Sequence, residues 1–252
     1  MSRLKPLRRE GIFSRDSVPG SGGLLAVWGS PGSGKTAAAV KIAVCLAKRD
    51  RQVILLLCGS AAPELPCLCP APEEPRSLGS ILAAAHVTRN LLRNHLVSSP
   101  LETLRLLGMR RGENARSYPP GGAAQAGELL DCLRAEADCV VCDCAASLAE
   151  DALSLRALLE ADRVLRLSPG GAKAASFFAS QLPLLREEGR QHGRHWLVSV
   201  GPGSRGKGDF SLAFPPELEG QRASGSLLSP LTARSSRAFL RTVEAICREV
   251  FP

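Results

Sequence analysis

The sequence predicts an α/β fold, built as a doubly wound, mainly parallel sheet with helices on both faces. Short apolar runs that are typical of buried strands alternate along the chain with longer segments of helical spacing. This alternation favours a parallel sheet that helices cover on both sides. The chain has 252 residues, of which 44% are hydrophobic and 22% are charged, a balance that excludes a disordered or collagen-like protein.

The elements up to residue 142 are predicted from local patterns. Residues 24–28 form an apolar run bounded by glycines, which is typical of a short buried strand. A helix is predicted over 37–48, because Val40, Val44 and Ala47 fall on one stripe at helical spacing. Residues 59–75 contain five prolines and no period, which predicts a long loop. The other elements expected here are strands at 53–57 and 139–142 and helices near 78–95 and 123–136.

The remainder of the chain continues the alternation and closes with a helix. We expect helices near 148–160 and 172–188 and strands at 164–167 and 196–200. Residues 201–230 are rich in Gly, Pro and Ser, and no element is assigned there. Ser235–Val250 is predicted as an amphipathic helix. Its apolar face is short and Glu244 and Glu249 interrupt its basic side, so we expect it to pack on the core rather than on a membrane.

The domain organisation can be predicted from the same patterns. Residues 1–20 are basic and without a period, and are interpreted as a tail. We expect residues 21–252 to form a single domain, because no linker divides them. No apolar run approaches the roughly 18 residues of a membrane span, and no apolar segment of a signal peptide comes after the basic start. The protein is therefore expected in the cytoplasm.

The formal net charge is +8, which raises the question of an anionic partner. The basic residues are scattered, and the one dense cluster lies at residues 3–9. We interpret this charge as the result of an arginine-rich surface exposed to solvent. A weak contact with DNA or a membrane is the alternative interpretation.

The nine cysteines do not predict a metal site. Disulfide frameworks belong to short secreted domains, so we expect reduced thiols. Cys139 and Cys142 have metal-ligand spacing, but a strand would point them to opposite faces of the sheet.

A phosphate-binding motif carries the functional prediction. The segment Gly29-Ser30-Pro31-Gly32-Ser33-Gly34-Lys35-Thr36 matches the pattern G-x-x-x-x-G-K-[ST], between a predicted strand and a predicted helix. Glycines let the backbone wrap a phosphate, and the helix N-terminus adds a positive dipole end. Lys35 is the predicted catalytic contact to the β- and γ-phosphates, and the Thr36 hydroxyl is a predicted Mg²⁺ ligand.

An acidic residue completes the predicted site. Asp143 stands at the carboxyl end of the strand 139–142, where ligands bind in open α/β sheets. We predict that it holds Mg²⁺ through water and acts as a catalytic residue. The chain contains no N-K-x-D sequence, so ATP is expected rather than GTP. No G-x-S-x-G segment supports serine hydrolase chemistry.

The order of these features resembles the MinD/ParA family of positioning and partitioning ATPases, especially relatives associated with Tad-type pilus assembly. Leu24–Thr36 is similar to their first strand and phosphate loop, and Ala137–Ala146 to their "YDxVIIDxPP" segment. Glu160–Leu165 is similar to their "ADxVLVV" strand. The resemblance implies ATP and Mg²⁺ as cofactors, face-to-face dimerisation, and slow hydrolysis that a partner stimulates.

The chain departs from this family at three positions. Ser30 stands where a signature lysine usually reaches the partner's nucleotide, so ATP-dependent homodimerisation is expected to be attenuated or absent. Cys58 stands where an aspartate usually positions the attacking water, and the nearest acidic residue is Glu64. The asparagine that often contacts adenine is missing at 198–201.

These features support three functional hypotheses. The first is an ATP-binding switch with slow or partner-stimulated hydrolysis, acting with a protein activator or cargo, in positioning or in pilus or secretion assembly. The second is a nucleotide-binding scaffold without catalysis. The third is a P-loop kinase or an AAA-like ATPase, for which Arg110, Arg111 and Arg116 form the one candidate lid cluster.

Overall fold

The computed structural model describes residues 22–69, 76–114, 116–118, 121–149, 151–187, 192–201 and 208–252. The tail predicted at residues 1–20 lies outside this part of the chain. Within it, eight strands form one sheet in the order β3-β4-β2-β5-β1-β6-β7-β8. The β3–β4 pair is antiparallel and the other pairs are parallel. The predicted α/β fold with a mainly parallel sheet is confirmed.

The strands are β1 (Gly23–Gly29), β2 (Val53–Leu57), β3 (Val97–Ser98), β4 (Leu104–Leu107), β5 (Cys139–Asp143), β6 (Arg163–Ser168), β7 (His195–Val200) and β8 (Phe210–Leu212). The helices are α1 (Lys35–Ala47), α2 (Leu65–Leu68), α3 (Leu78–Leu82), α4 (Arg89–His95), α5 (Ala123–Glu136), α6 (Ala152–Glu160), α7 (Gly171–Glu187), α8 (Pro216–Ala223) and α9 (Arg237–Val250).

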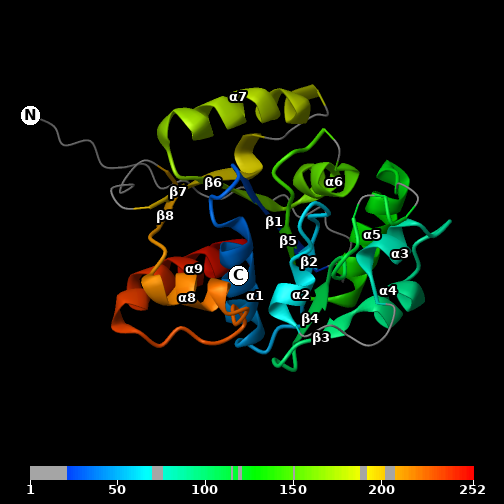
Figure 1. Cartoon of the computed structure of the whole chain (residues 1–252), viewed down its shortest axis with the longest axis horizontal. Coiled ribbons are helices and arrows are strands. Elements are labelled where there is room, and N and C mark those ends of the chain that lie inside the picture. The colour runs from blue at the N-terminus through cyan, green and yellow to red at the C-terminus, as the bar shows by residue number, and fades with distance from the viewer. Residues whose placement is uncertain are drawn as a thin grey trace, which may run out of the picture.

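Helices cover both faces of the sheet (Figure 1). The apolar cluster on one face joins the sheet to α1, α8 and α9, and the cluster on the other face joins it to α3, α4, α5 and α6. Alternate residues of β1 divide between the two clusters, as the pleat of a strand requires: Leu25 and Val27 on one side, Leu24 and Trp28 on the other. Both faces are therefore buried, which explains why the central strands are apolar throughout.

Two predictions from the sequence needed correction, and four elements had not been predicted. The predicted loop at 59–75 contains the one-turn helix α2. The predicted helix near 78–95 is two helices, because Thr88 is extended and its hydroxyl caps the start of α4 by accepting from the Leu91 N–H at 3.2 Å. The strands β3 and β4 were not predicted, and the unassigned passage 201–230 contains β8 and α8.

The C-terminal helix packs on the core, as predicted. Phe239, Val243 and Ile246 are buried against the face of the sheet that α1 covers, while Val250 is only partly buried. Within the described residues, no helix is both long and apolar enough to cross a membrane.

A buried lysine attaches the segment after β8 to α1. The Lys41 ammonium donates to the Gln221 side chain at 2.6 Å and to the carbonyls of Leu227 and Ser229 at 2.6 and 2.7 Å. Burial lowers the pKa of Lys41 to about 8. These contacts hold α8 and the segment after it beside α1.

Candidate functional site

The glycine-rich segment forms a compact loop between β1 and α1. Gly32 and Gly34 have positive φ angles of 74° and 80°, a conformation that favours glycine at both positions. The Ser33 N–H donates to the carbonyl of Ser30 at 3.1 Å and closes the turn. A Cβ atom at Gly34 would collide with the ring of Phe214, which packs against the loop. The loop is therefore held tightly at the N-terminus of α1.

Lys35 is the first residue of α1 and its ammonium stays at the loop. Its Nζ atom lies 3.5 Å from the carbonyl oxygen of Ser30. Burial lowers the pKa of Lys35, while the negative charges of Asp143 and Glu64 raise it. The structure thus places the predicted phosphate-binding cation where the charges of both acidic residues act on it.

Thr36 and Asp143 meet although 107 positions separate them. The Thr36 hydroxyl donates to Asp143 Oδ2 at 2.6 Å. This contact forms because β1 and β5 are parallel neighbours, with Val27 in register with Asp143, so that the strand end and the helix start face each other. The two predicted metal-binding residues are therefore brought together.

The polar atoms of this site are incompletely paired. Asp143 is only 6% exposed, and its Oδ1 atom has no hydrogen-bond partner among the described residues. The buried Ser33 hydroxyl likewise has none in the described part of the chain. Burial raises the pKa of Asp143 to about 7, although the Thr36 hydroxyl and the Lys35 charge lower it. Buried polar atoms are normally satisfied, so both of these oxygen atoms retain the capacity to bind a further partner.

The residues present fit a nucleotide with Mg²⁺. A hydroxyl and a carboxylate are the oxygen ligands that Mg²⁺ prefers, and Mg²⁺ commonly keeps waters and phosphate oxygens as further ligands. Within the described ranges, no cluster of three or more His, Cys, Asp or Glu side chains could hold a metal ion by itself. The loop glycines and Lys35 would surround the phosphates.

Two of the positions at which the chain departs from the family pattern, Ser30 within the loop and Cys58 directly after β2, are both buried. Ser30 is 3% exposed, so its hydroxyl does not project from the surface. Cys58 is 4% exposed. A hydrogen bond with Cys144, together with burial, raises the pKa of the Cys58 thiol well above its usual range. A neutral buried thiol cannot orient water as a carboxylate does.

Glu64 lies closer to the site than its place in the sequence indicates. It precedes α2, is partly buried, and has its pKa raised by burial, while the charges of Arg222 and Lys35 lower it. Its charge also acts on Asp143. The fold thus places the Glu64 carboxylate where its charge acts on Lys35 and Asp143. The residue directly after β2 is Cys58, which carries no carboxylate.

Sequence reasoning missed Phe214 and Arg222, which belong to the passage that had no readable pattern. Phe214 contacts Gly34, and the charge of Arg222 acts on Glu64. A cavity of about 430 Å³ opens beside Arg222, lined by α2, Arg111 and residues 222–225. The only local pattern in this passage is a group of turn residues around Pro215. Such a pattern predicts a turn, but it does not predict that Phe214 contacts Gly34 or that Arg222 acts on Glu64.

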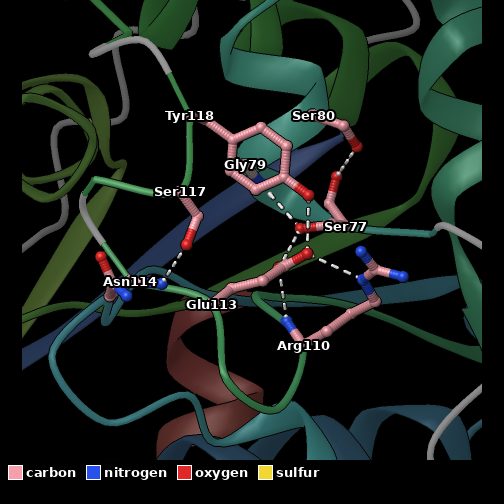
Figure 2. Close-up of polar contacts among 8 residues, drawn as sticks. All are labelled: Ser77, Gly79, Ser80, Arg110, Glu113, Asn114, Ser117 and Tyr118. Atoms are coloured by element: carbon pink, nitrogen blue, oxygen red, sulfur yellow. Dashed lines mark hydrogen bonds and ion pairs between the residues drawn. The ribbon is translucent and has the colours of Figure 1, made fainter.

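A hydrogen-bonded cluster around Glu113 connects the loop after β4 to the start of α3, as Figure 2 shows. Glu113 accepts hydrogen bonds from the Ser77 hydroxyl at 2.5 Å, the Arg110 N–H at 2.8 Å, the Arg110 Nε at 2.7 Å and the Tyr118 hydroxyl at 2.6 Å. Burial raises the pKa of Glu113, but these bonds outweigh it and lower the pKa to about 2. We call Ser77, Arg110, Glu113 and Tyr118 the Glu113 cluster. It joins this loop to α3, and both carboxylate oxygens of Glu113 are paired within it.

The cysteines behave as the strand geometry predicts. Cys139 and Cys142 pack in the apolar clusters on opposite faces of the sheet. The cysteines of the chain are free thiols. The two thiols of this pair therefore lie on opposite faces of the sheet, as their spacing on a strand predicts.

Comparison with known proteins identifies the fold. No family model and no curated protein matches the sequence. Among solved structures, a ParA family ATPase from Chlorobium tepidum has a TM-score of 0.71 at 14% identity, over 89% of this chain and 98% of that one. MinD from Pyrococcus horikoshii, complexed with Mg-ADP, has a TM-score of 0.68 at 15% identity, over 88% and 95%. The fold is that of the MinD/ParA ATPases.

A third MinD/ParA structure is the MinC:MinD cell division complex of Aquifex aeolicus, with a TM-score of 0.63 at 15% identity, over 90% of this chain and 95% of that one. Identities this low establish the MinD/ParA fold alone. The resemblance to the branch associated with Tad pili stays a prediction, as do the roles of the site residues.

Proposed function

We propose that the protein is an ATP- and Mg²⁺-binding switch of MinD/ParA type, with slow or partner-stimulated hydrolysis. The observation that carries this proposal is the pair Thr36–Asp143, held at 2.6 Å directly after the glycine-rich loop, with one carboxylate oxygen unpaired among the described residues. Oxygen ligands for Mg²⁺ beside a loop for phosphates are what a nucleotide site of this class requires.

Each residue has a role in this proposal. The backbone of residues 29–36 surrounds the phosphates, and Lys35 contacts the β- and γ-phosphates. Thr36 binds Mg²⁺ directly, and Asp143 holds it through water. ATP is the proposed nucleotide because no N-K-x-D segment is present for guanine, and Mg-ADP is bound to the MinD of Pyrococcus horikoshii.

Slow hydrolysis is proposed because of the residues beside this loop. Cys58 is a buried neutral thiol where a water-orienting carboxylate is expected, and Glu64 is the nearest acidic side chain after it. Binding requires neither, whereas hydrolysis needs an oriented water. If the protein shows no turnover, the buried neutral thiol of Cys58 favours the second candidate, a nucleotide-binding scaffold without catalysis.

The proposal extends to the assembly and the cellular role of the protein. Because Ser30 is buried and neutral, we propose a monomer or a dimer that responds weakly to ATP. We further propose a single domain at 21–252, a cytoplasmic location, and a protein partner as activator or cargo in positioning or in pilus or secretion assembly. A partner complex is known for the MinD of Aquifex aeolicus, which binds MinC. A weak contact with DNA or a membrane is also part of the proposal, because the net charge of +8 attracts anionic partners.

The proposal is tested by ATP titration calorimetry with and without Mg²⁺, and then by phosphate release. Wild type should bind Mg-ATP and turn over orders of magnitude more slowly than the enzyme median of about 10 s⁻¹. Lys35→Ala should weaken ATP binding about 10- to 100-fold, because a charge-assisted contact contributes ~1.5–3 kcal/mol. Lys48→Ala, at an exposed lysine near the end of the same helix, is the matched control. Equal affinity in wild type and Lys35→Ala would refute the phosphate-loop assignment.

Sedimentation velocity with ADP and with a non-hydrolysable ATP analogue tests assembly separately. A complete monomer-to-dimer switch with the analogue would show that a residue other than Ser30 supplies the contact across the dimer.

A further inference from the structure

Two cysteines from segments far apart in the sequence meet where α1 and α9 pack side by side (Figure 1). Cys45 lies in the last turn of α1 and Cys247 in the last turn of α9. Their thiols are hydrogen-bonded to each other. The phosphate loop adjoins the other end of α1, about 15 Å away along the helix axis. This pair of thiols is therefore separate from the proposed nucleotide site.

The two thiols differ in their access to solvent. Cys45 is partly exposed, whereas Cys247 is 0% exposed and packs in the apolar cluster between the helices and the sheet. The Cys247 sulfur also lies 3.8 Å from the carbonyl oxygen of Ile42 on α1. A small reagent can therefore reach Cys45 from solvent, while Cys247 is held behind it, in contact with the Cys45 sulfur.

The surroundings of Cys45 favour its thiolate. The hydrogen bond from Cys247 and the positive charges of Arg49 and Lys48 lower the pKa of Cys45 to about 7, although burial and the charge of Glu244 raise it. Arg49 is held near the pair because its guanidinium donates to the Glu244 carbonyl of α9 at 3.4 Å. The contact with Cys45, together with burial, raises the pKa of Cys247. Cys45 is therefore the nucleophile of the pair, and Cys247 keeps its proton.

A second pair of contacting thiols shows which features matter. Cys58 and Cys144 are also hydrogen-bonded to each other, but they are 4% and 2% exposed. The pKa values of both thiols lie above their usual range, and burial contributes to each shift. A buried neutral thiol is unreactive. Contact between two sulfurs is thus not sufficient, and the partial exposure and basic neighbours of Cys45 distinguish the pair between α1 and α9.

We propose that Cys45 and Cys247 form a dithiol site that hydrogen peroxide converts reversibly to a disulfide. The Cys45 thiolate attacks one oxygen of the peroxide, the O–O bond breaks, and the departing hydroxide takes up a proton to become water. Cys45 is thereby oxidised to a sulfenic acid. The Cys247 sulfur then attacks the Cys45 sulfur, the S–O bond breaks, and the Cys247 proton leaves with the hydroxide as water.

The two steps together oxidise two thiols to one disulfide and reduce one hydrogen peroxide to two waters. Cys247 is a weak nucleophile, but its contact with Cys45 holds it beside the sulfenic sulfur, which favours the second step. A thiol reductant returns the pair to its free form by exchange. The disulfide would join the helix that follows the phosphate loop to the last helix of the chain.

The test exposes the reduced full chain to a slight molar excess of hydrogen peroxide. Remaining thiols are blocked with iodoacetamide, and the digested chain is analysed by mass spectrometry without reduction. We expect a peptide pair linked through Cys45 and Cys247, which dithiothreitol separates. Cys247→Ser should abolish this link and leave at Cys45 a sulfenic acid that dimedone labels. A separate measurement follows the alkylation of Cys45 by iodoacetamide against pH. Its midpoint should lie near pH 7 in wild type and rise in Cys247→Ala.

Cys132→Ser is the matched control, because Cys132 is also partly exposed but lies on α5, where its thiol donates to the Val87 carbonyl. This variant should form the link as wild type does. The proposal is overturned if peroxide leaves Cys45 and Cys247 open to alkylation, or if Cys45 links instead to another cysteine or to a second chain. Loss of the link in Cys132→Ser would also overturn it. If the Cys247 variants fail to fold, the peptide link and the alkylation midpoint of wild type still decide the question.

Discussion

Asp143 and Glu113 are two acidic side chains largely removed from water, and their pKa values shift in opposite directions. Asp143 accepts one hydrogen bond, from Thr36, and burial raises its pKa to about 7. Glu113 accepts four hydrogen bonds, which outweigh burial and lower its pKa to about 2. The difference comes from the deeper burial of Asp143 and from the larger number of donors around Glu113.

This contrast separates a structural carboxylate from a ligand-binding one. The donors around Glu113 come from its own loop and from Ser77 at the start of α3, and they pair both of its carboxylate oxygens (Figure 2). Asp143 retains an Oδ1 atom without a partner among the described residues, within reach of the Lys35 charge. We therefore assign Glu113 to stability and Asp143 to the proposed site. Three predictions test that division.

The largest expected effect is on stability. Glu113→Ala removes the common acceptor of the Glu113 cluster and leaves its donors unpaired, so the free energy of unfolding should fall by about 3 kcal/mol. Urea denaturation of Glu113→Ala beside Glu219→Ala measures this loss. Glu219 is a suitable control because its side chain is 71% exposed and pairs with Arg222 at the surface. If Glu113→Ala loses no more stability than Glu219→Ala does, Glu113 does not have the structural role that we assign to it.

A smaller effect is expected in acid. The native pKa of Glu113 is about 2, below the ordinary 4.5, so as the pH falls through 4.5 the unfolded chain takes up a proton before the native one. Stability from this group is thus complete above pH 4.5 and is lost as the pH falls toward 2. Because the unfolded carboxyl is only half protonated at pH 4.5, the loss between about pH 4.5 and 3 should be ~1.6 kcal/mol, at no more than about 1.36 kcal/mol per pH unit. The decline should be shallower in Glu113→Gln than in wild type, as urea midpoints across this range would show.

The smallest stability effect is expected at Asp143. Burial disfavours its charge, so at about pH 8 Asp143→Asn should keep the free energy of unfolding within about 1 kcal/mol of wild type, or above it. The same variant should lose the gain in ATP affinity that Mg²⁺ provides. Asp131→Asn, at an exposed position of α5, serves as the control. A destabilisation as large as that of Glu113→Ala, with Mg²⁺ dependence intact, would reverse our assignment of the two carboxylates.

The sequence alone was sufficient to predict the central strands and the first helix. It was also sufficient to select the glycine-rich loop and Asp143 as candidate site residues. Patterns of apolar residues placed β1, β2, β5 and α1 within two residues of their observed limits, because buried strands and helices need local runs of apolar side chains. The phosphate motif was readable because its eight consecutive residues act through their own backbone. Asp143 could be added because the end of a central parallel strand has a known position in such folds.

Contacts between distant segments were decided only by the tertiary structure. Edge strands β3 and β8 are two and three residues long, too short to carry a period. Phe214 packs against Gly34, and the charge of Glu64 acts on Lys35, although each pair comes from segments far apart in the chain. A local pattern reports which face of an element is buried. Which side chains then meet depends on the order of strands in the sheet and on the packing of the helices over it.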